Sequence, residues 1–357
     1  MRTADFDFTL PPELIAQTPT AARDGSRLMV MHRADHRLAH RSFREVPDLL
    51  RAGDLLVLNN SRVLRARLRG LKPTTGGEVE LLLVEETARN EWWTLLRPGK
   101  RVRPGTEIHL RTNTGAPSAI RAVILAKNPE GHCQVRFTGT PQILDELDSL
   151  GEIPLPPYIE RAAGAADDAR YQTVYAQADG SVAAPTAGLH FTPELLDQVR
   201  ARGVQVHFVT LHVGLGTFAP VKAENIADHP MHEERFELPA ATADAINAAK
   251  REGRRVIAVG TTTVRVLESA AQLPGCESQL TALQGRTRIF IYPPYRFRVI
   301  DGLLTNFHLP QSTLLMLVSA FAAPGELRGR EFILAAYAEA VRERYRFFSY
   351  GDATLII

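Results

Sequence analysis

The feature that most constrains the fold is a change of pattern along the chain. Between about residues 70 and 150, short runs typical of strands are separated by turns that contain glycine and proline. Short strands at this spacing are typical of a compact antiparallel sheet or a small barrel. The five runs are Glu78–Glu85, Trp92–Leu96, Glu107–Arg111, Ala119–Ala126 and Cys133–Phe137. The proline-rich segment Gly151–Pro157 then forms a stiff exit from this region.

The second half of the chain alternates strands with helices. Thr192 is a good helix cap, Pro193 suits the first helical position, and Gly203 is a good stop. Further helices are predicted over Thr242–Glu252, from Gly260–Thr263 to about Ala271, over Thr313–Ala323 after the cap Ser312, and over Arg330–Arg344. Strands are predicted at Val204–Leu211, Val256–Val259, Arg288–Ile291 and Leu303–Thr305. This alternation implies a largely parallel sheet covered on both faces.

These patterns together predict an α/β fold. The helix-covered sheet domain comprises residues 1–70 and 151–357, and an inserted small β-barrel domain comprises residues 71–150. Hydrophobic residues make up 45% and charged residues 23% of the 357 residues, so a sizeable core is expected. The two cysteines, Cys133 and Cys276, lack CxxC spacing and indicate neither a metal site nor a disulfide framework.

Charge and apolar runs limit where the protein acts. The net charge of +2 means that a polyanion has to bind local basic clusters. No apolar run follows Met1, so no secretory signal is expected. The longest apolar run, Leu314–Ala323, is shorter than the roughly 20 residues that span a bilayer. We therefore expect a soluble, cytoplasmic protein with no membrane association.

Two loops that mix histidine, glycine and threonine in an apolar setting are the main candidates for a ligand pocket. They are Ala184–Phe191 and Leu211–Phe218. Glycine lets a ligand approach the backbone, threonine offers a donor and an acceptor, and histidine moves protons near neutral pH. His190 precedes a helix start and His212 ends a strand, which are positions where ligands collect in α/β proteins.

Two more junctions between a strand and a helix carry polar residues. Gly260–Thr263 leads into one helix, and Thr305–His308 followed by Ser312 leads into another. Threonines are also common helix caps, so each junction alone is a weak indication. Four such junctions are more than capping usually requires.

The segment His229–Glu234 resembles a metal site only superficially. His229 and His232 are three residues apart, but Pro230 disfavours a regular helix and no third ligand is implied. Acid–base work or binding of a cationic group by Glu233 or Glu234 is the favoured interpretation, and a solvated acidic turn is the alternative.

Basic clusters allow an interaction with RNA. Arg65, Arg67 and Arg69 share one face if they lie on a strand, and Arg286–Arg298 interleaves arginines with aromatic residues. Arginine with aromatic side chains suits phosphate contact and base stacking. Exposed arginines that protect a sheet edge are the alternative.

Many of these motifs together resemble one known family, the S-adenosylmethionine:tRNA ribosyltransferase-isomerases of the queuosine pathway. The resemblance covers nearly the whole chain in order, and Thr305–Phe321 is its most specific part. Its other motifs are Phe6–Phe8, Leu14–Pro19, Arg23–Leu28, Gly151–Tyr158, Tyr171–Tyr175, Ala184–Thr192, His212–Pro220, Met231–Glu234, Gly260–Ser269, Asp301–Phe321 and Tyr345–Asp352.

The resemblance implies an α/β fold with an inserted β-barrel and an unusual use of S-adenosylmethionine. The ribosyl part is transferred to 7-aminomethyl-7-deazaguanine at the wobble position of a tRNA, which yields epoxyqueuosine-tRNA, adenine and methionine. S-adenosylmethionine is then a consumed substrate, and neither a metal nor another cofactor is expected. A monomer is expected. One departure is Asn60 in Asn59–Val63, where family members often carry aspartate; Asn60 cannot ionise, which argues against a general base there.

The chemistry requires a base, an acid for the departing adenine, and groups that position a cation and an amino acid end. His190 and His212 are the leading acid–base candidates, followed by His308 and His232. The methionine carboxylate is expected at the helix starts, and Arg65, Arg67 and Arg69 are expected to contact tRNA phosphates. The candidate substrate-binding residues are Thr186, Gly188, Gly214, Gly216, Thr217, Glu233, Glu234, Thr261, Thr262, Thr263, Asn306 and Ser312.

Two other functions compete with this one. A conventional methyltransferase would also be α/β, but the chain has no glycine-rich GxGxG turn after its first strand. A non-catalytic RNA-binding protein would explain the arginines but not the four polar junctions.

Overall fold

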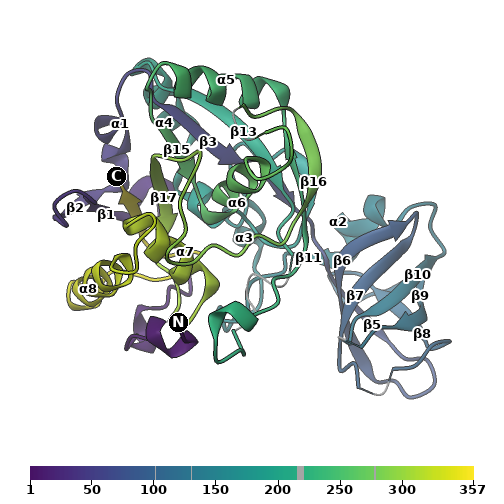
Figure 1. The fold of residues 1–357 in the computed structure, drawn as a ribbon. Coiled ribbons are helices and arrows are strands. Elements are labelled where there is room, and N and C mark those ends of the chain that lie inside the picture. The colour runs from purple at the N-terminus through teal and green to yellow at the C-terminus, as the bar shows by residue number, and fades with distance from the viewer. Residues whose placement is uncertain (101, 130, 215–220, 277–278) are drawn as a thin grey trace.

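The chain forms two large sheets of different kinds (Figure 1). The computed structural model describes residues 1–100, 102–129, 131–214, 221–276 and 279–357. The nine-stranded sheet forms the centre of a larger body, and the seven-stranded sheet lies to one side of it. None of the helices in these described ranges is both long and apolar enough to cross a membrane.

The nine-stranded sheet has parallel strands at its centre and antiparallel strands towards its edges. Its order is β16-β14-β13-β3-β15-β17-β18-β1-β2, with β13, β3, β15 and β17 mutually parallel. The strands are β1 (Arg27–Met31), β2 (Leu38–Ser42), β3 (Leu55–Asn59), β13 (Gln205–Leu211), β14 (Glu234–Leu238), β15 (Val256–Val259), β16 (Leu283–Thr287), β17 (Gly302–Asn306) and β18 (Ala353–Ile356).

The prediction of a largely parallel sheet is therefore wrong at the edges. β2 pairs antiparallel with β1, because the connection between them is too short for the helical crossover that a parallel pair requires. β18 is antiparallel to β17 on one side and parallel to β1 on the other. At the other edge, β14 pairs antiparallel with both β13 and β16.

Helices cover both faces of this sheet, and the side-chain alternation of β3 shows how. Leu55 and Val57 pack on one face with residues of α5, α6, α7 and α8, whereas Leu56 and Leu58 pack on the other with residues of α1 and α4. These helices are α1 (Val46–Leu49), α4 (Pro193–Ala201), α5 (Ala240–Arg251), α6 (Thr261–Ala270), α7 (Thr313–Ala322) and α8 (Gly329–Arg342). As predicted, Thr192 caps α4: its side chain accepts a hydrogen bond from the Leu195 backbone N–H.

The short helices lie mainly between the larger elements. Two are the α-helices α2 (Leu147–Leu150) and α3 (Ala165–Arg170). The others are the 3₁₀ turns η1 (Thr3–Phe6), η2 (Pro12–Leu14), η3 (Arg23–Gly25), η4 (Phe43–Glu45), η5 (Ile143–Glu146), η6 (Thr186–His190) and η8 (Ile226–Asp228).

The seven-stranded sheet has the order β11-β5-β6-β7-β10-β9-β8, and β5 also pairs with β8. Six of its strands therefore form a closed ring of pairings around a second apolar core. The strands are β5 (Arg67–Leu71), β6 (Glu78–Ala88), β7 (Glu91–Arg97), β8 (Glu107–Arg111), β9 (Pro117–Lys127), β10 (Cys133–Thr138) and β11 (Gly151–Glu152). The sheet thus begins before residue 71 and ends after residue 150. The small pair β4 (Ser61–Val63) and β12 (Ala178–Ser181) forms a separate sheet.

The strand predicted at Arg288–Ile291 is wrong. The edge strand is β16, five residues earlier, in which partly buried and exposed residues alternate up to the buried Thr287. Such an edge strand carries polar residues and shows no apolar run. Ile291 is buried because the irregular segment that contains it packs against the core.

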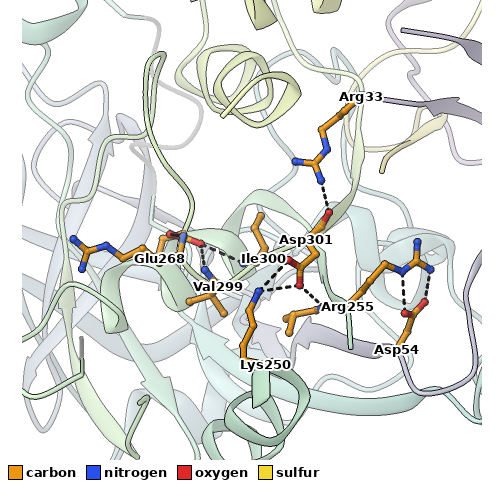
Figure 2. A network of polar contacts seen from close by, with 10 residues as sticks. Arg33, Asp54, Lys250, Arg255, Glu268, Val299, Ile300 and Asp301 are labelled. Atoms are coloured by element: carbon orange, nitrogen blue, oxygen red, sulfur yellow. Dashed lines mark hydrogen bonds and ion pairs between the residues drawn. The ribbon is translucent and has the colours of Figure 1, made fainter. Parts of the chain in front are cut away.

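The end of the sheet at which β15 and β17 begin is held by carboxylates, of which Glu268 is buried and Asp301 is partly exposed (Figure 2). Asp301 accepts hydrogen bonds from Lys250 Nζ at 3.0 and 2.9 Å and from the Val256 backbone N–H. Glu268 is fully buried on α6 and accepts backbone N–H groups of Arg298 at 2.9 Å and Val299 at 3.0 Å. Glu268 therefore fixes the irregular segment before β17 to the helix, which sets the position of that strand.

Replacement of Glu268 should destabilise the fold strongly. In Glu268→Ala the backbone N–H groups that it now satisfies remain buried without acceptors, so we expect the free energy of unfolding to fall by about 2–5 kcal/mol. Glu331→Ala on α8, where the carboxylate is largely exposed, is the control and should change it by less than about 0.5 kcal/mol. Urea denaturation measures both; equal, small effects would contradict this role for Glu268.

Candidate functional site

A cavity lies where the central parallel strands end. Its volume is about 290 Å³. Asn306 ends β17, Gly260 follows the neighbouring strand β15, and Val213 comes soon after β13, so the carboxyl ends of three parallel strands contribute to this cavity. Open α/β sheets bind ligands at this carboxyl end of their strands. Its walls comprise Tyr158, Ala183–Ala187, Val213, Val221, Gly260–Thr262, Thr305–Ser312, Leu314, Phe348 and Ser349.

Asn306 is the most constrained polar residue of this cavity. Its amide nitrogen donates to the Phe348 carbonyl at 3.1 Å and lies 3.5 Å from the Asp352 carbonyl. The same nitrogen is 3.1 Å from His190 Nε2. Among the described residues, nothing hydrogen-bonds the amide oxygen Oδ1, although it is buried. Asn306 thus presents an acceptor that a ligand donor can satisfy.

His190 supports Asn306 from behind. Because Asn306 Nδ2 faces carbonyl oxygens, it must be the donor, so His190 Nε2 accepts and its ring proton lies on Nδ1. Nδ1 then donates to Ser26 Oγ at 2.8 Å. Burial, with smaller contributions from Arg346 and Arg23, lowers the pKa of His190 to about 3. The ring, stacked on Phe43, does not form part of the cavity wall.

His308 is the imidazole that does line the large cavity within the described part of the chain. Its Nε2 lies 3.2 Å from Thr305 Oγ1, and its backbone N–H donates to Tyr337 Oη. Burial lowers the pKa of His308 to about 3, so the ring is neutral at physiological pH. A neutral imidazole in a ligand cavity can accept a proton.

Two residues of the cavity wall have left-handed backbone conformations. These are Phe348, with φ of 74°, and Gln311, with φ of 56°. Such a conformation is costly for an aromatic residue and persists only where its surroundings impose it. The Phe348 backbone N–H donates to the Phe307 carbonyl, which imposes it here. The Phe348 ring packs on Tyr158 with centroids 4.2 Å apart, which provides an aromatic surface at the cavity.

The predicted hydroxyl-bearing residues divide into two groups. Thr186, Thr261, Thr262 and Ser312 line the large cavity, and Ser312 also caps α7 through the Leu315 backbone N–H. Thr263 does not line it, because its hydroxyl is buried and donates to the Val259 carbonyl at 2.7 Å.

The predicted glycines and His212 do not line the described cavities. A Cβ at Gly188 would lie 2.0 Å from Tyr175 Oη, so this glycine is required by packing. The Gly214 backbone N–H donates to Glu234 Oε1 at 2.9 Å. His212 is half-buried beside Gly180, and burial lowers its pKa. Gly216 and Thr217 lie outside the described residues.

A second, smaller cavity of about 30 Å³ contains His232 and Glu234 in its wall, together with His229 and Arg265. Glu234 forms a buried ion pair with Arg265. Glu233 instead lies at the surface, where it pairs with Arg286 and Arg288. No group of three or more histidine, cysteine or acidic residues within the described ranges is arranged to hold a metal ion.

The three arginines proposed for tRNA contact are all paired with carboxylates. Arg65 contacts Asp168 at 2.8 Å, and Arg67 lies 3.7 Å from Glu80. Arg69 holds Glu152 through two hydrogen bonds of 2.7 and 3.1 Å. A phosphate would therefore have to compete with these carboxylates.

Sequence reasoning missed several residues that shape the site. Tyr158 and Ser349 line the cavity and share a hydrogen bond of 2.5 Å. The sequence motifs that contain them gave neither residue a role in binding. Asn59 pairs with both backbone groups of Leu211 at the end of β13. Asn60 Oδ1 accepts a hydrogen bond from the Thr210 hydroxyl, and Asn60 is not part of the cavity wall. Arg265 could have been found as a charge between the apolar residues Val264 and Val266 of α6.

Comparison with known proteins places the chain in an enzyme family. A family model described as queuosine biosynthesis protein matches residues 3–356. The S-adenosylmethionine:tRNA ribosyltransferase-isomerases of Thermotoga maritima and Carboxydothermus hydrogenoformans are 49% and 52% identical to it, and each match covers 100% of both chains. A crystal structure of S-adenosylmethionine tRNA ribosyltransferase from Thermotoga maritima matches with a TM-score of 0.56 and 41% identity, covering 99% of this chain and 100% of that chain.

The fold and the comparisons thus first define a mixed α/β protein of queuosine biosynthesis. The chain belongs, more narrowly, to the S-adenosylmethionine:tRNA ribosyltransferase-isomerase family, a family of transferases and isomerases.

The buried state of His190 predicts a pH dependence of stability. Its pKa is 6.5 in the unfolded chain and about 3 in the fold, so the unfolded state takes up the proton first as the pH falls. The neutral His190 ring makes its full contribution to the free energy of unfolding above pH 6.5. As the pH falls towards 3 this contribution is lost, at up to roughly 1.4 kcal/mol per pH unit. In urea titrations, the free energy of unfolding of His190→Gln should fall less steeply below pH 6.5 than that of the wild-type protein. Parallel pH dependences of the two proteins would contradict a buried neutral ring.

Proposed function

We propose that the protein transfers and isomerises the ribosyl moiety of S-adenosylmethionine onto 7-aminomethyl-7-deazaguanine in tRNA. The products are epoxyqueuosine-tRNA, adenine and methionine. The observation that carries the proposal is the cavity at the strand ends, whose wall combines aromatic rings, the acceptor Asn306 Oδ1 and the neutral His308. Family membership over the whole chain supports the same reaction.

The cavity suits the nucleoside part of this substrate. Its volume of about 290 Å³ lies near the lower limit of small-molecule sites, which run from about 300 to 1,000 Å³. Phe348 and Tyr158 offer faces for a purine, and Asn306 Oδ1 accepts a hydrogen bond from an exocyclic amine or a ribose hydroxyl. Thr261 and Thr262 at the start of α6 lie at the same wall.

His308 is the acid–base residue in this proposal, and His190 positions Asn306. The reaction begins when neutral His308 takes a proton from the 5′ carbon beside the sulfonium. The carbanion rearranges, and adenine departs with the proton that His308 returns to it. The substrate amine then attacks and loses a proton to solvent, and methionine leaves with the electron pair of the carbon–sulfur bond as the epoxide closes. The sulfonium supplies both the acidity of the C–H bond and the leaving group, so the proposal includes no metal or prosthetic group.

We also propose that residues 71–150, which carry five of the six strands of the closed ring, form a separate inserted β-barrel domain, and β5 (Arg67–Leu71) then supplies the sixth strand from its border. The larger body, from residues 1–70 and 151–357, then carries the chemistry as a cytoplasmic monomer. The cavity wall supports this division of roles, because none of its residues lies between residues 71 and 150.

One assay separates this activity from its rivals. The protein is mixed with S-adenosylmethionine and tRNA that carries 7-aminomethyl-7-deazaguanine, and the small products are separated by chromatography. We expect adenine and methionine in equal amounts. S-adenosylhomocysteine instead would indicate a methyltransferase, and no turnover would indicate a binding protein.

In His308→Gln, the rate of adenine release should fall by about 10²–10⁴-fold, which is the usual contribution of a positioned acid–base group. Glutamine can still hydrogen-bond the Thr305 hydroxyl, but its amide cannot accept and return a proton at neutral pH. The matched control is His207→Gln on β13, which does not line the cavity and should keep its turnover. A His308→Gln enzyme with near-normal turnover would remove this assignment.

If Arg69 contacts tRNA, its release from Glu152 should strengthen that contact. Glu152→Gln frees the guanidinium fork, and we expect tighter tRNA binding at low salt. Glu91→Gln changes the net charge equally and releases Arg136 on the same sheet. Equal effects of both variants in filter binding would indicate a general charge effect and contradict a specific contact.

A further inference from the structure

Arg265 is a buried cation whose hydrogen bonds are incomplete. It lies on α6 and points into an interior where its side chain is only 7% exposed. One guanidinium nitrogen, Nη1, pairs with Glu234 Oε2. The other two, Nε and Nη2, are buried, and no described residue accepts a hydrogen bond from either.

The two unoccupied atoms form the edge of the guanidinium that suits a carboxylate. Nε and Nη2 donate two parallel hydrogen bonds to the two oxygens of one carboxylate. This protein uses the same edge elsewhere: Arg69 holds Glu152 in this way, and Arg255 holds Asp54 at 2.9 and 2.5 Å. At Arg265 no carboxylate of the described residues occupies this edge.

The space beside Arg265 is small and adjoins the nucleoside cavity. It is the cavity of about 30 Å³, enough for about two water molecules or one carboxylate group. Leu314, near the start of α7, lines both this cavity and the large one. The two cavities therefore adjoin at Leu314, and a ligand that occupies both has to pass this side chain.

We propose that Arg265 and Glu234 form the subsite for the amino acid end of S-adenosylmethionine. The carboxylate binds the Nε–Nη2 edge of Arg265, and the ammonium group faces Glu234. This inference rests on the proposed function. It assigns the carboxylate to Arg265 in place of the helix starts at Thr261–Thr263 and Ser312.

Charge favours this occupant over a tRNA phosphate. The Arg265–Glu234 pair presents opposite charges side by side, which matches a zwitterion better than an anion. Glu234 accepts hydrogen bonds from Arg265 and from the Gly214 backbone N–H, and its negative charge attracts the ammonium group. A phosphodiester is flanked by riboses on both sides, and a cavity of about 30 Å³ has no room for them.

The test compares ligands with and without the amino acid end. Arg265→Lys keeps the positive charge but loses the two-pronged edge. In the presence of substrate tRNA, we expect the KM for S-adenosylmethionine to rise by about tenfold or more, as for loss of a charge-assisted pair. The inhibition constant of 5′-methylthioadenosine, which lacks the amino acid end, should stay within about twofold.

Arg255→Lys is the matched control. It breaks the same kind of edge-on pair, with Asp54, at the opposite end of β15. It should leave the KM for S-adenosylmethionine unchanged. A comparison that needs no variant uses decarboxylated S-adenosylmethionine with the wild-type protein, which should bind about tenfold more weakly than S-adenosylmethionine.

Three results would overturn the assignment. They are an unchanged KM in folded Arg265→Lys, equal losses for S-adenosylmethionine and 5′-methylthioadenosine, or weaker tRNA binding alone, which would assign Arg265 to a phosphate. Failure of the proposed function is a different outcome, because the wild-type protein would then release no adenine. Calorimetric binding of the two nucleosides still tests Arg265 in that case.

Discussion

The hydrogen-bond chain from Ser26 through His190 to Asn306 is the interaction on which the site depends. It links the residue before β1, the turn η6 and the last residue of β17, three segments far apart in sequence. The chain holds because His190 stays neutral, with its proton on Nδ1. The amide nitrogen of Asn306 then donates, and its buried oxygen has no hydrogen-bond partner among the described residues. Loss of this tautomer would reverse the polarity that Asn306 presents.

The sheet provides the second constraint. Four parallel strands at its centre bring their carboxyl ends to one edge, so short polar segments converge without any contact along the sequence. The opposite edge is closed by Asp301, Glu268 and the Asp54–Arg255 pair (Figure 2). At one end of the parallel strands these carboxylates accept internal hydrogen bonds. Within the described ranges, Asn306 at the other end and Arg265 on α6 have buried polar atoms without hydrogen-bond partners.

Much of the fold could be predicted from the sequence, because local rules decide it. Val256–Val259 and Glu107–Arg111 have the predicted bounds, and Thr192 caps its helix as expected. The edge strand β16 could not be predicted, because a half-exposed strand has no apolar run. The junctions at Thr261 and Asn306 were found, but His190 and Gly188 have packing neighbours that only the tertiary structure reveals. The acids that pair with Arg65 and Arg69 come from distant segments for the same reason.

The central claim is that the cavity at the strand ends holds the nucleoside of S-adenosylmethionine against Asn306. A crystal structure of the protein with S-adenosylmethionine and substrate tRNA tests it most directly. We expect the purine beside Phe348 and a ligand donor within about 3.2 Å of Asn306 Oδ1, a normal hydrogen-bond distance. A ligand bound elsewhere, with Asn306 Oδ1 still unpaired, would contradict the claim.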